Sequence, residues 1–206
     1  AKSPAMLFYL DNVQSVAPGS QPPQLRRPRM AGRQMRPSPE QLRQRMPRGL
    51  NENYARELLE LHTLGVDGGY TQDDVVNVAR ILTGWSIDLP RRGTEFAFHD
   101  WAHDRDEKTV LGTTFPAGHE MSEGVELLKM LARHPSTMRH VGNKLCARFV
   151  NDEPPSGCVD AAVRAWEASG GEIREVLRAI FSSPEFWAAE NRAAKTKTPL
   201  EFVASA

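Results

Sequence analysis

The chain lacks the long apolar runs and the net charge that would place it in a membrane or on a polyanion. None of its 206 residues lies in an uninterrupted apolar stretch approaching the ~20 residues that a membrane-spanning helix needs. Its 26 basic and 26 acidic residues balance. With 40% apolar and 25% charged residues it has the composition of an ordinary globular protein. We therefore expect no membrane span and a single folded domain over residues 1–206.

Cysteine is scarce, with only Cys146 and Cys158 in the chain. The two residues flank a turn at 151–155, so a bridge between them is sterically conceivable in an oxidising compartment. A pair of buried thiols is the interpretation that we favour. The absence of a second pair with metal-ligand spacing excludes a structural zinc knuckle.

Aromatic residues are absent from the stretch between Gln21 and Arg48, which carries eight arginines and several prolines. Such a segment has few side chains to bury and cannot offset the entropy lost on ordering. We predict a mobile Arg/Pro-rich insertion over residues 15–48 that can be deleted without unfolding the rest. Recognition of single-stranded nucleic acid usually adds aromatic stacking to basic charge, so nucleic acid is not the expected partner.

Apolar residues recur with a helical period through most of the chain. Helices are expected over residues 51–64 and 71–82, and four more follow from residue 122 onward. Between about 85 and 120 this period disappears, and Phe96–Phe98 and Thr109–Leu111 read as two strands joined by a polar loop. The predicted fold class is mostly α: an antiparallel helical bundle or array with one small β-hairpin excursion (about 85–120).

The helical period also predicts which side chains face the core. The inward positions are Leu58, Leu61, Val78, Leu82, Leu145, Phe149, Trp166, Leu177 and Phe181. On the wheel of the first predicted helix, Glu57 lies at the border of the apolar face and His62 lies inside it. We therefore expect both of these polar side chains to be at least partly buried.

Several motifs resemble one protein family. The longest is GLNENYARELLELHTLG at residues 49–65, followed by residues 68–72 and 82–85 and by shorter pieces around His103-Asp104, Lys108 and His134-Pro135. These resemble the bacterial family called domain of unknown function 1800 (DUF1800). The resemblance implies a mostly helical protein, typically about twice this long and often made with an export signal. We therefore expect this chain to be the C-terminal half of a longer protein that acts in the periplasm or outside the cell.

Four residues are candidates for acid/base catalysis because their side chains can exchange protons near neutral pH or carry a carboxylate: Glu57, His62, His103 and Asp104. The polar loop also offers a weaker candidate site for a divalent metal, made of His99, His103 and Asp104. Its spacing matches neither a zinc-peptidase helix nor a calcium loop. A structural alternative stays open, in which Asp104 orients His103 to brace the hairpin.

Two functions are compatible with this sequence. The first is an exported hydrolase or lyase that acts on an extracellular polymer through a Glu/His/Asp site. The second is a non-catalytic scaffold or interaction module that is partnered with another exported protein. No phosphate-binding loop and no G-x-S-x-G nucleophile elbow occurs. An open pocket lined by the candidate residues would favour the enzyme, whereas saturation by internal hydrogen bonds would favour the scaffold.

Overall fold

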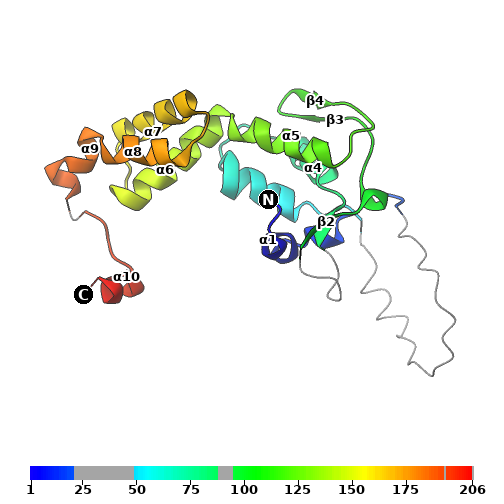
Figure 1. The fold of residues 1–206 in the computed structure, drawn as a ribbon, viewed down its shortest axis with the longest axis horizontal. Coiled ribbons are helices and arrows are strands. Elements are labelled where there is room, and N and C mark those ends of the chain that lie inside the picture. Colours follow the sequence, from blue (N-terminus) through cyan, green and yellow to red (C-terminus); the bar gives the residue numbers. More distant parts are fainter. Residues whose placement is uncertain (21–48, 88–94, 193, 206) are drawn as a thin grey trace, which may run out of the picture. The chain divides into compact units, whose positions relative to one another are not determined.

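A computed structural model describes residues 1–20, 49–87, 95–192 and 194–205 (Figure 1). Contacts divide the chain into two compact units. Unit 1 comprises Ala1–Leu58 and Tyr70–Leu127, and unit 2 comprises Leu59–Gly69 and Leu128–Ala206.

The predicted insertion at residues 15–48 lies outside the described residues from residue 21 onward. Its first residues are anchored to unit 1. Ser15 forms a parallel bridge with Gly49, and the amide of Ala17 donates to the carbonyl of Ala102 at 2.8 Å. Val16 and Ala17 are buried, so a deletion of this segment has to begin after them.

Unit 1 packs short helices around an apolar core. Its helical elements are α1 (Pro4–Tyr9), η1 (Asn12–Gln14), α3 (Asn53–Glu57), α4 (Gln72–Ile81), η3 (Asp100–Ala102) and the first part of α5 (Met121–Ala132). A capping box between Thr71 and Asp74 begins α4, as its sequence predicts. The largest fully buried apolar side chains of this unit are Trp85, Tyr54, Leu7, Ile81, Leu82, Leu127, Val75 and Val78.

The β-structure consists of two antiparallel two-stranded sheets. One pairs β1 (Trp85–Ile87) with β2 (Phe96–Phe98), and the other pairs β3 (Lys108–Val110) with β4 (Thr113–Phe115). The prediction that the two expected strands pair with each other in one hairpin was therefore wrong. Both strands form, but each pairs with a different partner strand. The reason is the two-residue turn after β3, where Leu111 and Gly112 both have positive φ, at 49° and 75°. Such a turn closes a local hairpin, and leucine in that position gives no sequence signal for it.

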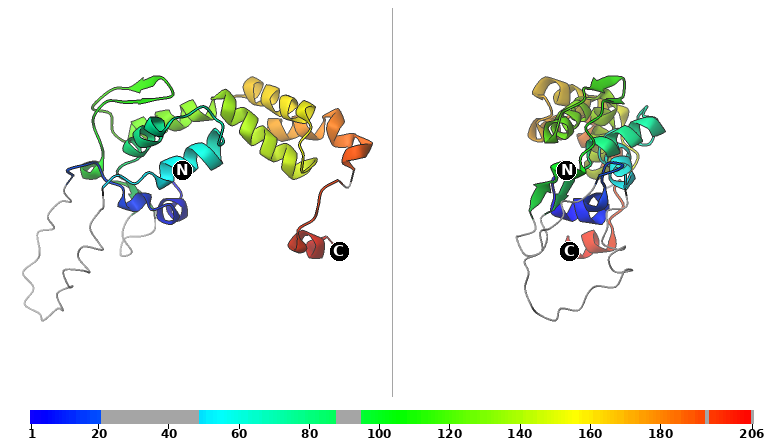
Figure 2. Two further views of the ribbon diagram at one scale, coloured as in Figure 1. Left: turned by 180° about the vertical axis from the view of Figure 1, so that it is seen from behind. Right: turned by 90° about the vertical axis from the view of Figure 1, so that its right-hand side faces the viewer.

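Unit 2 is an array of antiparallel helices. It contains α6 (Pro135–Phe149), α7 (Ser156–Ser169), α8 (Ile173–Phe181), α9 (Pro184–Trp187), η4 (Ala189–Asn191) and α10 (Pro199–Ala204). Figure 2 shows α6, α7 and α8 side by side. Their shared core is formed by Met138, Cys146, Val150, Cys158, Val159, Ala162, Trp166, Val176 and Ile180. The prediction of a mostly helical fold is confirmed.

The first predicted helix changes its winding halfway. It is α-helical over α3 and π-helical over Leu58–Thr63 (η2), where the amide of Leu64 donates to the carbonyl of Leu59 five residues earlier at 2.8 Å. A wheel drawn at 100° per residue does not describe this wider turn. The expectation that Leu61 and His62 face the core is therefore wrong, and both are exposed.

Other predicted core positions divide into two groups. Leu58, Val78, Leu82 and Trp166 are buried as expected. Leu145 and Leu177 are only half-buried, and Phe149 and Phe181 are 41% and 38% exposed. For Leu177 and Phe181 the discrepancy arises because α8 is apolar on two sides: Val176 and Ile180 enter the core, and the other apolar stripe faces outward. Phe149 of α6 contacts Phe181 edge-to-face and lies on the same exposed side.

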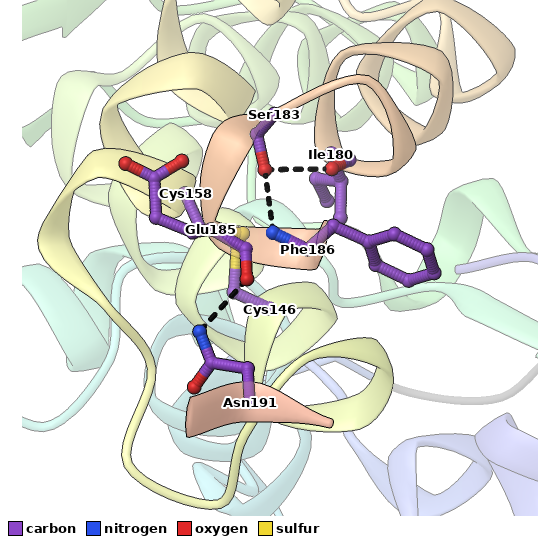
Figure 3. The surroundings of a disulfide bond; sticks show 7 residues. All are labelled: Cys146, Cys158, Ile180, Ser183, Glu185, Phe186 and Asn191. Atoms are coloured by element: carbon purple, nitrogen blue, oxygen red, sulfur yellow. Dashed lines mark hydrogen bonds between the residues drawn. A yellow bond between two sulfur atoms is a disulfide. The ribbon is translucent and has the colours of Figure 1, made fainter. Parts of the chain in front are cut away.

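Cys146 and Cys158 form a disulfide that joins α6 to α7 (Figure 3). The expectation of two buried thiols is therefore corrected in its chemistry, although both residues are fully buried. Antiparallel packing of the two helices brings their Cα atoms within 6.2 Å, which allows a disulfide. Beside the bridge, the Ser183 hydroxyl accepts from the amide of Phe186 and begins α9.

We predict that replacing both cysteines by alanine lowers the free energy of unfolding of unit 2 by about 2–4 kcal/mol, since the bridge restricts the unfolded chain. Denaturant titration with and without dithiothreitol measures this. Reductant should destabilise the wild type once the chain opens and should leave the double variant unchanged. Equal stability of the two proteins under oxidising conditions would contradict the prediction.

Candidate functional site

His103 and Asp104 are held by the end of α4. Thr83, two residues after α4, accepts through its hydroxyl from the amide of Asp104 at 2.8 Å and donates to the carbonyl of Arg80 at 2.6 Å. Gly84 has φ of 80°, and a Cβ there would lie 2.7 Å from the carbonyl oxygen of His99. Glycine therefore permits the close approach that brings this loop against the start of β1.

The His103 side chain is enclosed, with an exposed fraction of 0%. Its Nδ1 lies 2.9 Å from the carbonyl oxygen of Thr83. Its Nε2 lies 3.1 Å from the carbonyl oxygen of His119 and 3.4 Å from Oε2 of Glu123. Carbonyl oxygens only accept hydrogen bonds, so both ring nitrogens have to donate. The surroundings therefore select the doubly protonated imidazolium.

Glu123 is a buried carboxylate shared by two cations. It lies in the first turn of α5, and its side chain is fully enclosed. Lys108 Nζ donates to its Oε1 at 3.2 Å and to its Oε2 at 2.9 Å. The same ammonium donates to the carbonyl oxygen of Asp104 at 2.5 Å. Lys108 and His103 thus neutralise one carboxylate from two sides.

Asp104 is engaged through both oxygens. Arg80 donates to it from Nε at 2.8 Å and from Nη2 at 3.2 Å, and the amide of Asp106 donates to Oδ1 at 3.0 Å. Arg80 is oriented in turn by the amide oxygen of Asn77 at 2.9 Å. This two-point pairing is the strong form of an arginine–carboxylate contact. The five charged residues Arg80, His103, Asp104, Lys108 and Glu123 are called the ion cluster below.

The cluster shifts the titration of two of its members. Burial alone would lower the pKa of His103, but the hydrogen bonds to Glu123 and to the Thr83 carbonyl outweigh it, and the pKa rises above its usual 6.5. Burial alone would raise the pKa of Asp104, but the hydrogen bond from Arg80 and the amide of Asp106 lower it below 3.8. Both shifts favour the charged forms that the contacts require.

The structure brings together only two of the four candidate catalytic residues. His103 and Asp104 are members of the ion cluster, whereas Glu57 is a half-buried residue at the end of α3 whose side chain forms no hydrogen bond or ion pair with the described residues. His62 belongs to unit 2 and is exposed. The candidate metal ligand His99 stacks on Trp101 with ring centroids 6.0 Å apart.

Donors for a metal are not gathered in the described part of the chain. No group of three or more His, Cys, Asp or Glu side chains there is placed to hold an ion. The ring nitrogens of His103 and both oxygens of Asp104 are already engaged by protein groups. Three surface depressions lined by described residues lie elsewhere, one beside Asp11 and Asn51 and two along α8, and the ion cluster lines none of them.

Sequence reasoning missed Arg80 and Glu123 as members of this site, and it noted Lys108 only as part of a family motif. A glutamate in a helical first turn is usually solvated, so Glu123 carried no signal as a single residue. Its position in the helix did carry a signal, because Glu123, Leu127 and Leu131 are spaced by four residues. All three are fully buried. A carboxylate on a buried apolar stripe needs a cation, and Lys108 provides it.

We predict that Glu123→Gln lowers the free energy of unfolding by about 3–5 kcal/mol, because it leaves two buried cations without their carboxylate. Urea titration followed by circular dichroism measures the change. Glu126→Gln is the matched control, since Glu126 is exposed on the same helix, and its effect should stay within about 0.5 kcal/mol. Similar stabilities of the two variants would show that the ion cluster contributes little.

The pKa of His103 predicts how stability depends on pH. A folded-state pKa raised above 6.5 gives stability that is fully present below pH 6.5 and is lost as pH rises through the folded pKa. The lowered pKa of Asp104 acts oppositely, and its contribution is lost only in acid. Urea titrations across neutral to alkaline pH should therefore show a decline in the wild type and in His62→Gln that His103→Gln lacks. The same decline in all three would assign it to other groups.

Comparison with known proteins places the chain in a family without adding an activity. Neither the curated proteins nor the solved structures gave a match. The family described as protein of unknown function (DUF1800) matches residues 1–206, which is the whole chain, and does not single out a C-terminal half. The matched region includes the 49–65 motif and every residue of the ion cluster. The chain therefore belongs to the DUF1800 family.

Proposed function

We propose that this chain is an exported, non-catalytic interaction module, in which the ion cluster has a structural role and holds its loop against α4 and α5. The observation that carries the proposal is the saturation of His103 and Asp104. Every ring nitrogen and carboxylate oxygen of the pair has a partner inside unit 1, and the His103 side chain is completely enclosed.

Acid/base catalysis needs an atom that the substrate can reach and a proton that can leave or arrive. His103 has no lone pair available for accepting a proton, because both nitrogens donate to oxygens of the protein. Asp104 is held in its ionised form by Arg80. The geometry thus favours the scaffold hypothesis over a hydrolase or lyase that uses these two residues.

The disulfide supports the proposed location. Disulfides persist in oxidising compartments and are rare in the cytosol of most organisms. The Cys146–Cys158 bridge would therefore form after transport to the periplasm or the extracellular space, in line with the export that the family resemblance implies. The described residues include no helix that is long and apolar enough to span a membrane.

Chemical modification tests the proposal without a known substrate. Diethyl pyrocarbonate reacts with accessible neutral imidazoles, and peptide mass spectrometry gives the rate at each histidine. We expect His62, which is exposed, to react rapidly in the native protein, and His103 to react only after addition of denaturant. Rapid modification of His103 in the native protein, with unchanged circular dichroism, would overturn the structural role.

A metal titration adds an independent test. Calorimetry with Zn²⁺ and with Mn²⁺ should give the same result for the wild type and for Asp104→Asn, because the Asp104 oxygens are occupied by Arg80. His62→Gln serves as the control for adventitious binding by an exposed imidazole. A stoichiometric site that is lost in Asp104→Asn and kept in His62→Gln would favour a catalytic metal centre instead.

A further inference from the structure

Unit 2 exposes two apolar surfaces that belong to different elements. The first, called the α8 face, consists of Ile173, Leu177, Phe181, Phe149 and Trp187. The three α8 residues are spaced by four and form one stripe, which continues through an edge-to-face contact between Phe181 and Phe149 at 5.3 Å. The Trp187 indole is fixed beside it, since its Nε1 donates to the carbonyl of Phe181 at 2.9 Å.

The α8 face adjoins a shallow groove. A depression of about 590 Å³ is lined by Arg174, Leu177, Arg178, Phe181 and Ser182. A second, of about 510 Å³, shares Arg178 and Ser182 with it and extends to α7, where small residues such as Ala165 and Ala168 line it. Small side chains beside apolar anchors form the type of groove that accepts an amphipathic helix.

The second exposed surface is the outer side of α10. Leu200, Phe202 and Val203 are 78%, 67% and 74% exposed, so three of the six residues of this helix present apolar side chains to water. The helix is nevertheless well formed. A capping box between Thr198 and Glu201 begins it, and an ion pair between Glu201 and Arg148 attaches it to the end of α6.

We propose that α10 of one copy of this chain docks into the α8 groove of a second copy, and that the reciprocal contact forms a symmetric dimer. The two surfaces are exposed in the same chain, so they do not cover each other within one copy. Reciprocal exchange of the same two patches is the closed, isologous arrangement that is commonest among homo-oligomers.

The argument for this occupant is the area of the two surfaces. Charge does not select it, because Arg178 of the groove already pairs with Glu175 at 2.7 Å and Glu201 of α10 already pairs with Arg148. Burial of both surfaces on two copies would remove roughly 1,600 Å² from water, which is the size of a standard stable interface. The contact lies in unit 2, so it does not depend on the role of the ion cluster.

Sedimentation equilibrium of the intact chain tests the proposal. We expect a dimer with a dissociation constant on the order of 10 µM. The double variant Leu200→Asp/Val203→Asp removes the apolar side of α10, and Ala168→Arg fills the groove at an exposed position. Each should weaken self-association by about tenfold or more. Val66→Asp is the control for a carboxylate placed on an exposed apolar residue, because Val66 is 71% exposed and lies outside both surfaces.

Mixing the two defective variants makes the test specific. A mixed dimer keeps one intact contact, between the α10 helix of Ala168→Arg and the groove of Leu200→Asp/Val203→Asp. The mixture should therefore associate more tightly than either variant alone. A wild type that stays monomeric up to about 200 µM, or a dimer that neither variant weakens, would overturn the proposal, as would a mixture that gains nothing.

Discussion

The organisation of unit 1 depends on one buried carboxylate. Glu123 is fully enclosed, and a carboxylate without partners in such a position would be strongly unfavourable. It is tolerated because Lys108 from β3 and His103 from the preceding loop both reach it. These contacts tie α5 to the loop and to β3, and Asp104 extends the tie through Arg80 to α4. Elements too short to be stable by themselves thereby acquire fixed positions.

A cluster of this kind contributes more to the uniqueness of a structure than to its net stability. Desolvation of five charged groups offsets much of their mutual attraction, while loss of any one partner leaves an uncompensated charge. Any other placement of the 99–108 loop would separate these charges from their partners and carry the same cost in free energy. The described β-strands have only three residues each, so their own ladders define the register weakly. We infer that the ion cluster selects one arrangement of the loop and the short strands.

Much of the fold was predictable, because helical periodicity and capping residues are local properties. The helices after residue 122, the capping box at Thr71 and both predicted strands follow from sequence. The site was predictable only in part. His103 and Asp104 could be identified from the chemistry of their side chains. Their partners come from α4 and α5, and no local sequence pattern predicts an ion pair between residues 15 or 24 positions apart. The π-helical turn was equally invisible, since it depends on what surrounds it.

The π-helical turn shows that neighbouring residues help to decide which side chains this segment exposes. Wide turns are intrinsically poorer than α-helical ones and rarely persist alone. Here the end of the segment is held by two side chains of α6, His140 and Lys144, which lie 3.3 Å and 2.7 Å from the carbonyl oxygen of Leu61. A Cβ on Gly65 would lie 2.7 Å from His140, so the turn that follows is confined as well. A peptide of residues 51–65 grafted elsewhere would relax to ordinary α-helical winding and display a different set of side chains.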